Sequence, residues 1–221
     1  MTGPRDLPGQ RPDTAIRAGQ RSRLWAIWMA IGAGAALGTF SAFANYSQIT
    51  SSVGQMVTPW IVTAALVGLF SPTLSVSGLT GGTALLLADL VYYAWAAATT
   101  GVETPRYLTV WAIAGLFVGP VSGITGWMSR HGSDGWRTLA AAGLTAVVWA
   151  ESFVLWSHID HLDAQITYVV ASVLALIMEL VILRDQGRRR WLAPALSLVL
   201  AVPIAFLFEE VFGRLGIVTP R

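Results

Sequence analysis

Hydrophobic and polar positions alternate in long blocks along the chain, with seven apolar stretches separated by short polar segments. An α-helix needs about 20 predominantly apolar residues to cross the hydrocarbon layer of a bilayer. The blocks therefore predict transmembrane helices over residues 24–44, 57–74, 78–98, 107–128, 136–156, 165–183 and 191–212. The second stretch has the shortest uninterrupted apolar part, and Pro59 lies near its start. We expect an all-α polytopic transmembrane bundle with seven spans, or with six spans and one re-entrant segment.

The polar segments alternate between arginine-rich and arginine-poor, which predicts the orientation of the chain in the membrane. If the N-terminus is cytoplasmic, the cytoplasmic segments carry eleven arginines and the outer segments carry three. Cytoplasmic loops of membrane proteins show this excess of basic residues. We expect a multi-pass protein of the cell membrane, surrounded by the lipid bilayer. Its predicted parts are a disordered basic cytoplasmic tail over 1–23, a transmembrane domain over 24–213 and a short outer tail over 214–221.

Composition excludes several classes of function. The chain is 54% hydrophobic and 12% charged, whereas about a quarter of the residues of soluble proteins are charged. The absence of cysteine excludes disulfides, thiolate catalysis and cysteine-ligated metals. There is no lysine for a Schiff base, and no P-loop, H-E-x-x-H or G-x-S-x-G motif. The arginines lie at span ends, where topology explains them, so we expect no nucleic-acid partner, and no cofactor.

Carboxylates inside the predicted spans are the first candidates for chemistry, because an ionisable group in the hydrocarbon layer costs several kcal/mol. Asp89 lies midway along the third span, with Tyr92 and Tyr93 one helical turn further on. These side chains could bind a polar ligand or relay a proton. The alternative is a neutral Asp89 that packs by a hydrogen bond to a neighbouring helix.

Glu151 and Glu179 are candidates in the fifth and sixth spans. Glu151 lies in the outer half of its span beside Trp149 and is a candidate proton donor or acceptor, the role we also consider for Asp89 if the protein is an enzyme. Glu179 lies near the cytoplasmic end of its span, where a salt bridge to the arginines of 184–190 is the favoured reading.

The ends of the last two spans carry further polar groups. Glu209 and Glu210 are adjacent, so they cannot both face the bundle, and at least one is expected to be solvated. The outer loop 157–163 contains His158 and His161 among aspartates, but a short loop rarely preorganises three ligands. We expect a solvated loop there and predict no metal site.

The polar residues after the first span complete a candidate site in the outer half of the bundle. The working hypothesis is an outward-facing cavity with Asp89 at its floor. Its candidate ligand-binding residues are Asn45, Tyr46, Trp60, Asp89, Tyr92, Tyr93, Trp149 and Glu151.

A stripe of small residues marks a close helix contact in the fourth span. Gly115, Gly119, Gly123 and Gly126 recur at the G-x-x-x-G spacing, with Pro120 among them. Glycines at this spacing let two helices approach closely in a membrane. The stripe predicts packing within the chain or, alternatively, a homo-oligomer or membrane-partner contact through Gly115, Gly119 and Gly123.

Several of these segments resemble a known family. They are Pro59-Trp60, Tyr92-Tyr93, residues 111–126 with the Gly119-Pro120-x-x-Gly123 core, and Ala150-Glu151. Across about residues 25–183 the chain resembles a family of small multi-span membrane proteins from high-G+C, actinobacterial-type bacteria, which is known as a domain of unknown function. The resemblance implies kinship of fold. It also implies that Tyr92, Tyr93 and Glu151 occupy positions where the family favours such residues.

Three classes of function fit these features. The first is a protein that binds or transports a small solute or lipid-like ligand, with intramembrane carboxylates for substrate binding or proton coupling. The second is an intramembrane enzyme, a proton-initiated prenyl or terpene cyclase acting on an isoprenoid-like ligand. In it, aromatic faces would stabilise a carbocation. The third is a structural or interaction subunit of a larger membrane complex.

Overall fold

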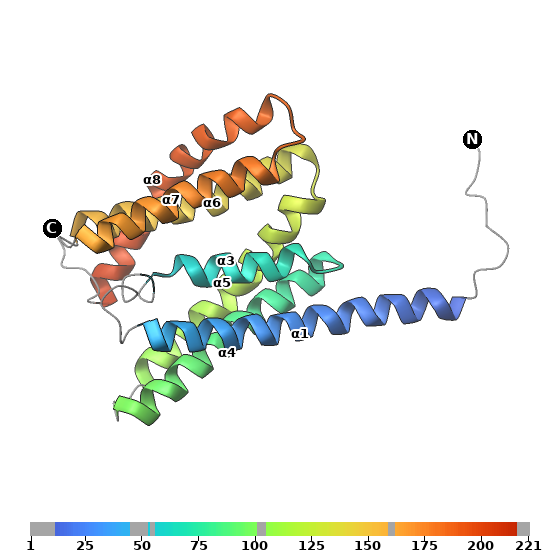
Figure 1. Ribbon diagram of the computed structural model, residues 1–221, viewed down its shortest axis with the longest axis horizontal. Helices are drawn as coiled ribbons and strands as arrows, with labels where there is room; N and C mark the ends of the chain where they lie inside the picture. Colours follow the sequence, from blue (N-terminus) through green and yellow to red (C-terminus); the bar gives the residue numbers. More distant parts are fainter. Residues whose placement is uncertain (1–11, 45–52, 54–55, 101–104, 159–161, 216–221) are drawn as a thin grey trace.

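The computed structural model describes residues 12–44, 53, 56–100, 105–158 and 162–215. Its helices are α1 (Pro12–Ala44), α3 (Thr58–Leu69), α4 (Leu74–Thr100), α5 (Pro105–His131), α6 (Asp134–His158), α7 (Leu162–Ile182) and α8 (Arg189–Leu215) (Figure 1). No strand occurs among these residues. The predicted all-α helical bundle is confirmed.

All of these helices except α3 are long and apolar enough to cross a membrane. The chain is therefore a multi-pass integral membrane protein. The seven helices run alternately up and down, so that the turns at 70–73, 132–133 and 183–188 lie at one end of the molecule together with the start of α1 (Figure 1). We call this the arginine-rich end, because Arg130, Arg137 and the arginines of 184–190 belong to it. The opposite end is the arginine-poor end.

The short helix α3 corrects the prediction of a span over 57–74. It has 12 residues, which correspond to about 18 Å, whereas the hydrocarbon layer is about 30 Å thick. Its C-terminal end precedes Pro72, and the residue before a proline disfavours helical geometry. Its N-terminal end lies inside the bundle, since the preceding Met56 is 2% exposed and packs with residues of α6, α7 and α8.

Helix α1 begins earlier than predicted. Residues 12–23 were assigned to a disordered tail, but they form the first turns of a 33-residue helix. This helix is about 50 Å long, and its first part extends beyond the other helices at the arginine-rich end (Figure 1). Alanine and arginine, which together provide five of these twelve residues, have high helix propensity and extend the helix beyond the apolar span. Residues 1–11 lie outside the described chain.

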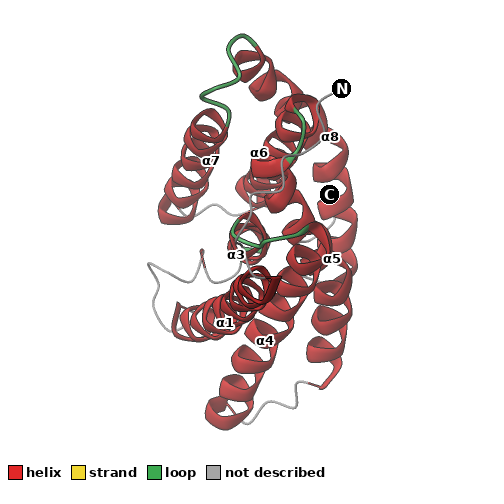
Figure 2. Cartoon of the chain, turned by 90° about the vertical axis from the view of Figure 1, so that its right-hand side faces the viewer, coloured by secondary structure: helices red, strands yellow, loops and turns green. Residues whose placement is uncertain are grey.

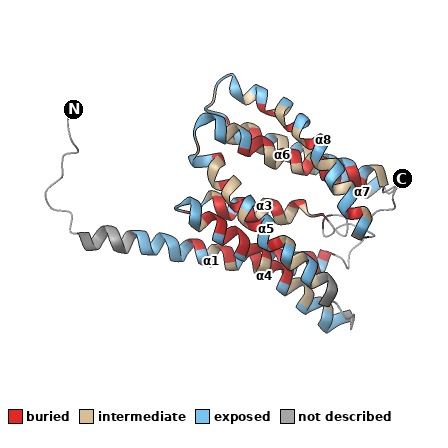
Figure 3. Ribbon diagram, turned by 180° about the vertical axis from the view of Figure 1, so that it is seen from behind, coloured by how far each residue is buried: buried red, intermediate tan, exposed pale blue. Residues whose placement is uncertain are grey.

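The helices form two groups (Figure 2). In the first group α4 packs against α1 and α5, and α3 lies against α4 and α5. In the second group α6 packs against α7 and α8, which have few contacts with each other. Buried residues concentrate where helices of a group face one another, while the outer faces of α7 and α8 are largely exposed to the surroundings (Figure 3). The groups meet through α5 with α6 and through α3 with α6.

The glycine stripe of α5 packs within the chain. A side chain at Gly123 would collide with the carbonyl oxygen of Ser77 on α4, and one at Gly126 with the carbonyl oxygen of Ala65 on α3. Gly119 faces Gly82 in the same way. The stripe is therefore the contact that allows α3, α4 and α5 to approach closely, which is the first of the two alternatives that the sequence left open.

Candidate functional site

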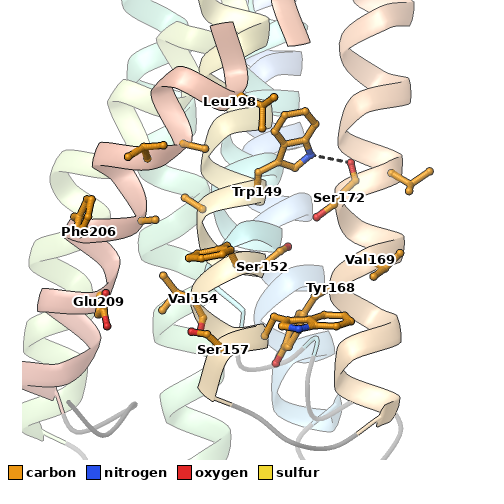
Figure 4. A pocket seen from close by; sticks show the side chains of 17 residues that line it. Trp149, Ser152, Val154, Ser157, Tyr168, Val169, Ser172, Leu198, Phe206 and Glu209 are labelled. Carbon is orange, nitrogen blue, oxygen red and sulfur yellow. Dashed lines mark hydrogen bonds between the residues drawn. The ribbon is translucent and has the colours of Figure 1, made fainter. Parts of the chain in front are cut away.

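The second helix group contains a groove in its arginine-poor half. Helices α7 and α8 lie on opposite sides of α6, which forms the floor, and the space between them has a volume of about 860 Å³ (Figure 4). Small-molecule sites in proteins commonly have about 300–1,000 Å³. The groove is lined by Trp149, Ala150, Ser152, Phe153, Val154, Trp156, Ser157, Tyr168, Val169, Ser172, Val173, Leu198, Ala201, Val202, Ala205, Phe206 and Glu209. We call it the α6–α8 groove.

Polar groups are distributed unevenly along this groove. Glu209, Ser157 and Tyr168 lie toward its arginine-poor end (Figure 4). Toward the other end the indole N–H of Trp149 donates a hydrogen bond of 3.1 Å to the backbone carbonyl of Ser172. Most of the remaining lining is apolar. The groove thus has one polar end and an apolar body.

Glu209 is the carboxylate of this polar end. It is half-buried and has no hydrogen bond or ion pair with any of the described residues. The neighbouring Glu210 is exposed and pairs with Arg214 at 2.6 Å. The two residues therefore divide as expected from their adjacency, one facing the groove and one the surroundings.

Glu151, a predicted candidate for proton transfer, contacts the start of α3. Its carboxyl group is fully buried on α6. The backbone N–H of Val57 donates to Oε1, and the backbone N–H of Thr58 donates to Oε2 at 2.7 Å. These N–H groups belong to the start of α3, where no side chain of the local sequence forms a cap. Glu151 therefore caps α3 from another helix, at the end where the helix dipole favours negative charge.

The predicted residues Asp89, Tyr92 and Tyr93 of α4 and Trp60 of α3 belong to the first helix group. The rings of Trp60 and Tyr92 meet edge to face at 6.4 Å, and those of Tyr92 and Tyr93 at 4.9 Å. Asp89 is 5% exposed and follows Ala88, which packs with Leu37, Ala64 and Leu85. No hydrogen bond or ion pair joins its carboxyl group to another described residue.

The structure thus divides the predicted site between the two groups. Trp149 lines the α6–α8 groove, but Asp89, Tyr92, Tyr93 and Trp60 do not. Glu151 lies between the two groups, beside Tyr168 of the groove wall. Asn45 and Tyr46 lie outside the described residues, as does His161. A cavity with Asp89 at its floor therefore stays a prediction.

The chain matches a family of unknown function over residues 17–216. The chain belongs to DUF6518. No curated protein and no solved structure matches it. The match covers the described helices of this DUF6518 protein almost completely. The bacterial origin that the sequence resemblance implies stays a prediction.

Sequence reasoning missed most of the groove of this DUF6518 protein. Ser172 and Glu179 lie seven residues apart on α7, Gln186 follows seven residues later in the turn after α7, and Thr138, Thr145 and Ser152 recur at the same spacing on α6. Residues seven apart lie on one face of a helix, so this spacing was the available signal for a polar inner face. The salt bridge expected for Glu179 is not among the ion pairs of the described residues. Its partner is instead Ser197, whose hydroxyl donates to Oε1 at 2.9 Å.

Proposed function

We propose that this protein binds, and transports or presents, a lipid-like amphiphile in the α6–α8 groove, in the cell membrane. The observation that supports the proposal best is the groove itself, which combines a volume of about 860 Å³ with an apolar body and one polar end. An amphiphile in a bilayer has the same division along its length. Its chain would lie along Leu198, Val202 and Phe206, with its polar group beside Glu209.

The charge at the polar end selects the ligand's head group. Glu209 is acidic and has no cation paired with it among the described residues. A carboxylate accepts hydrogen bonds and repels anions. The groove therefore favours an alcohol or an amine as the head group over a phosphate or a carboxylate. An isoprenoid alcohol and a long-chain amine both meet these requirements.

Two pairs of adjacent residues test the proposal. Phe206 and Leu207 are similarly exposed on α8, but only Phe206 lines the groove. Of the adjacent glutamates, Glu209 lines the groove and Glu210 does not. The variants Phe206→Ala and Glu209→Gln probe the site, and Leu207→Ala and Glu210→Gln are their matched controls.

The assay is native mass spectrometry of the purified protein, followed by quenching of tryptophan fluorescence by brominated long-chain alcohols, amines and fatty acids of equal length. We expect a co-purifying amphiphile in the wild type and both controls. Binding by Phe206→Ala should weaken about 5–30-fold, which corresponds to the loss of about 1–2 kcal/mol of apolar contact. Glu209→Gln should reduce the preference for amines over fatty acids. Equal binding by site and control variants would refute the proposal.

The other two functions have less support in the geometry. A cyclase needs an acid that faces its substrate. The two predicted acids do not meet this requirement in the groove, because both oxygens of Glu151 accept N–H groups of α3 and Asp89 does not line the groove. An interaction subunit was predicted from the glycine stripe of α5, and these glycines contact α3 and α4 of the same chain.

A further inference from the structure

The helices that form the walls of the groove converge at a buried carboxyl group. Glu179 of α7 accepts a hydrogen bond from Ser197 of α8. On the arginine-rich side of this bond, Leu183 and Ala193 pack together against α6. On its other side α7 and α8 diverge and the groove begins, lined by Ser172 one heptad before Glu179 and by Leu198 next to Ser197. The Glu179–Ser197 contact is therefore the apex of the α6–α8 groove.

Glu179 is 1% exposed, and only one of its two oxygens has a hydrogen-bond partner among the described residues. Its second oxygen, Oε2, is buried in the helix group, and Thr145 of α6 lies beside the carboxyl group. Among the described residues, the polar groups beside this carboxyl group are Thr145 of α6 and Ser197 of α8, and neither is charged. A carboxylate in this position is costly unless it is neutralised or fully hydrogen-bonded.

The two hydroxyl groups can satisfy Glu179 both with and without a proton. Each hydroxyl has one hydrogen to donate, and each has a backbone carbonyl nearby as an alternative acceptor. The Ser197 hydroxyl lies 3.0 Å from the carbonyl oxygen of Ala193, and the Thr145 hydroxyl lies 3.3 Å from that of Ala175. When Glu179 is ionised, both hydroxyls can turn to its oxygens. When it is protonated, its O–H can donate to a hydroxyl oxygen while that hydroxyl turns to the backbone carbonyl.

Polar groups also lead to this position from both sides. Toward the groove lies Ser152, a buried residue whose hydroxyl has no partner among the described residues. Toward the arginine-rich end lies Gln186, whose side-chain oxygen accepts from Thr138 at 2.8 Å and whose buried Nε2 has no such partner. Buried polar atoms of this kind are usually satisfied by ordered water. Water at these places would hydrate the interior of the helix group on both sides of Glu179.

We propose that Glu179 is a proton-binding site at the apex of the α6–α8 groove, and that a ligand in the groove changes its protonation. The site binds a proton by forming the O–H bond of a neutral carboxylic acid and releases it by the reverse step. Coupling is expected because a ligand between α7 and α8 would change the separation of these helices and so the Glu179–Ser197 contact. Such coupling between two sites is reciprocal. Only this coupling rests on the proposed function.

Infrared difference spectroscopy between acidic and alkaline pH tests the proton site without any ligand. We expect a carboxylic-acid C=O band in the wild type that disappears on alkalinisation, is absent in Glu179→Gln and shifts in Ser197→Ala. The exposed Glu210→Gln is the matched control and should retain it. Should Glu179→Gln fold poorly, isotope-labelled glutamate assigns the band to a glutamate, and its shift in Ser197→Ala assigns it to Glu179. A band that is assigned to Glu179 and persists at every pH at which the protein is folded would overturn the proposal and make Glu179 a permanently neutral packing residue.

The coupling is tested by adding the brominated long-chain alcohol at constant pH. We expect the Glu179 band to change in intensity in the wild type at saturation, and to change less in Phe206→Ala at the same concentration. A titrating band that saturating alcohol leaves unchanged would overturn the coupling but not the proton site. Failure of every brominated amphiphile to quench tryptophan fluorescence would instead overturn the proposed function.

Discussion

The cap on α3 by Glu151 leads to a quantitative prediction. Helix α3 has 12 residues, about 18 Å, so it starts within the apolar layer rather than at its surface. The N–H groups of Val57 and Thr58 are satisfied there by the two oxygens of Glu151. Pro59 follows them and has no N–H of its own. Removal of the carboxyl group would therefore leave two buried donors without their acceptor.

The expected magnitude follows from the number and kind of these hydrogen bonds. A hydrogen bond to a charged group contributes about 1.5–3 kcal/mol. Glu151→Ala removes two and is expected to lower the free energy of unfolding by about 3–6 kcal/mol. Glu151→Gln retains one acceptor oxygen but places an NH₂ group against the other N–H, so we expect about half of this loss.

A different mechanism would give a clearly smaller number. Ordinary hydrogen bonds between transmembrane helices average about 0.6 kcal/mol, because polar groups find other partners in the unfolded state within the membrane. Two such bonds would contribute only about 1.2 kcal/mol. The two accounts of Glu151, cap of a buried helix end or ordinary interhelical contact, are thus separated by a factor of two or more.

Unfolding in mixed micelles with increasing SDS content, followed by tryptophan fluorescence, measures this loss. Amide hydrogen exchange of the peptide containing Val57 and Thr58 gives a local measurement, and exchange there should accelerate in both variants. The control is Glu210→Gln, which removes an exposed pair with Arg214 and should cost about 0–1 kcal/mol. A loss of about 1 kcal/mol or less in Glu151→Ala, with unchanged exchange at the start of α3, would refute the capping argument.

Three further predictions concern other parts of the chain. Gly126→Ala should lower the unfolding free energy by about 1–3 kcal/mol or more, because the added Cβ meets a backbone carbonyl of α3 that cannot rotate away. The control Gly143→Ala, with no atom within 4 Å of the added Cβ, should change this free energy by less than about 0.5 kcal/mol. Equal effects in the two variants would contradict the packing argument. Asp89→Asn should leave amphiphile binding unchanged in the fluorescence assay, since Asp89 does not line the α6–α8 groove. Loss of binding in this variant would instead support the binding site at Asp89 that the sequence predicted. Arg137→Gln should lower the free energy of unfolding in the micelle assay by about 1–3 kcal/mol. The reason is that the Arg137 guanidinium donates to the carbonyls of Ser129 and Ile182 and so joins α5 and α7 to α6. A variant as stable as the wild type would show that hydrogen bonds to solvent replace these bonds.

The chain's long apolar blocks predicted the helices well, because crossing a bilayer imposes a length and a hydrophobicity that the sequence displays directly. Six predicted spans correspond to long apolar helices, with ends that differ by a few residues except at the start of α1. The stretch 57–74 is the one predicted span for which no helix of membrane-crossing length is observed, since the helix there covers Thr58–Leu69. There the apolar signal was weakest, and a proline at each end set the limits.

Individual site residues were harder to predict, because the sequence shows that a carboxyl group is buried but not what it faces. Glu151 was expected to be a proton carrier, and its partners are two backbone N–H groups more than 90 residues away. Glu179 was expected to form a salt bridge with nearby arginines, and its partner is a serine of the next helix. Both contacts depend on how the helices rotate about their axes, which a membrane span with an apolar surface on all sides does not reveal.

By itself, the sequence determined that this protein is a helical membrane protein, which stretches form its spans and which end of the bundle is rich in arginine. These properties follow from the transfer of residues between water and lipid, which acts on each segment separately. Only the tertiary structure decided that α7 and α8 diverge over α6 to form a groove, that Trp149 lies in it while Asp89 does not, and that Glu179 lies at its apex. Helix association inside lipid depends on close packing between particular faces, and this information is distributed over residues that are distant in the chain.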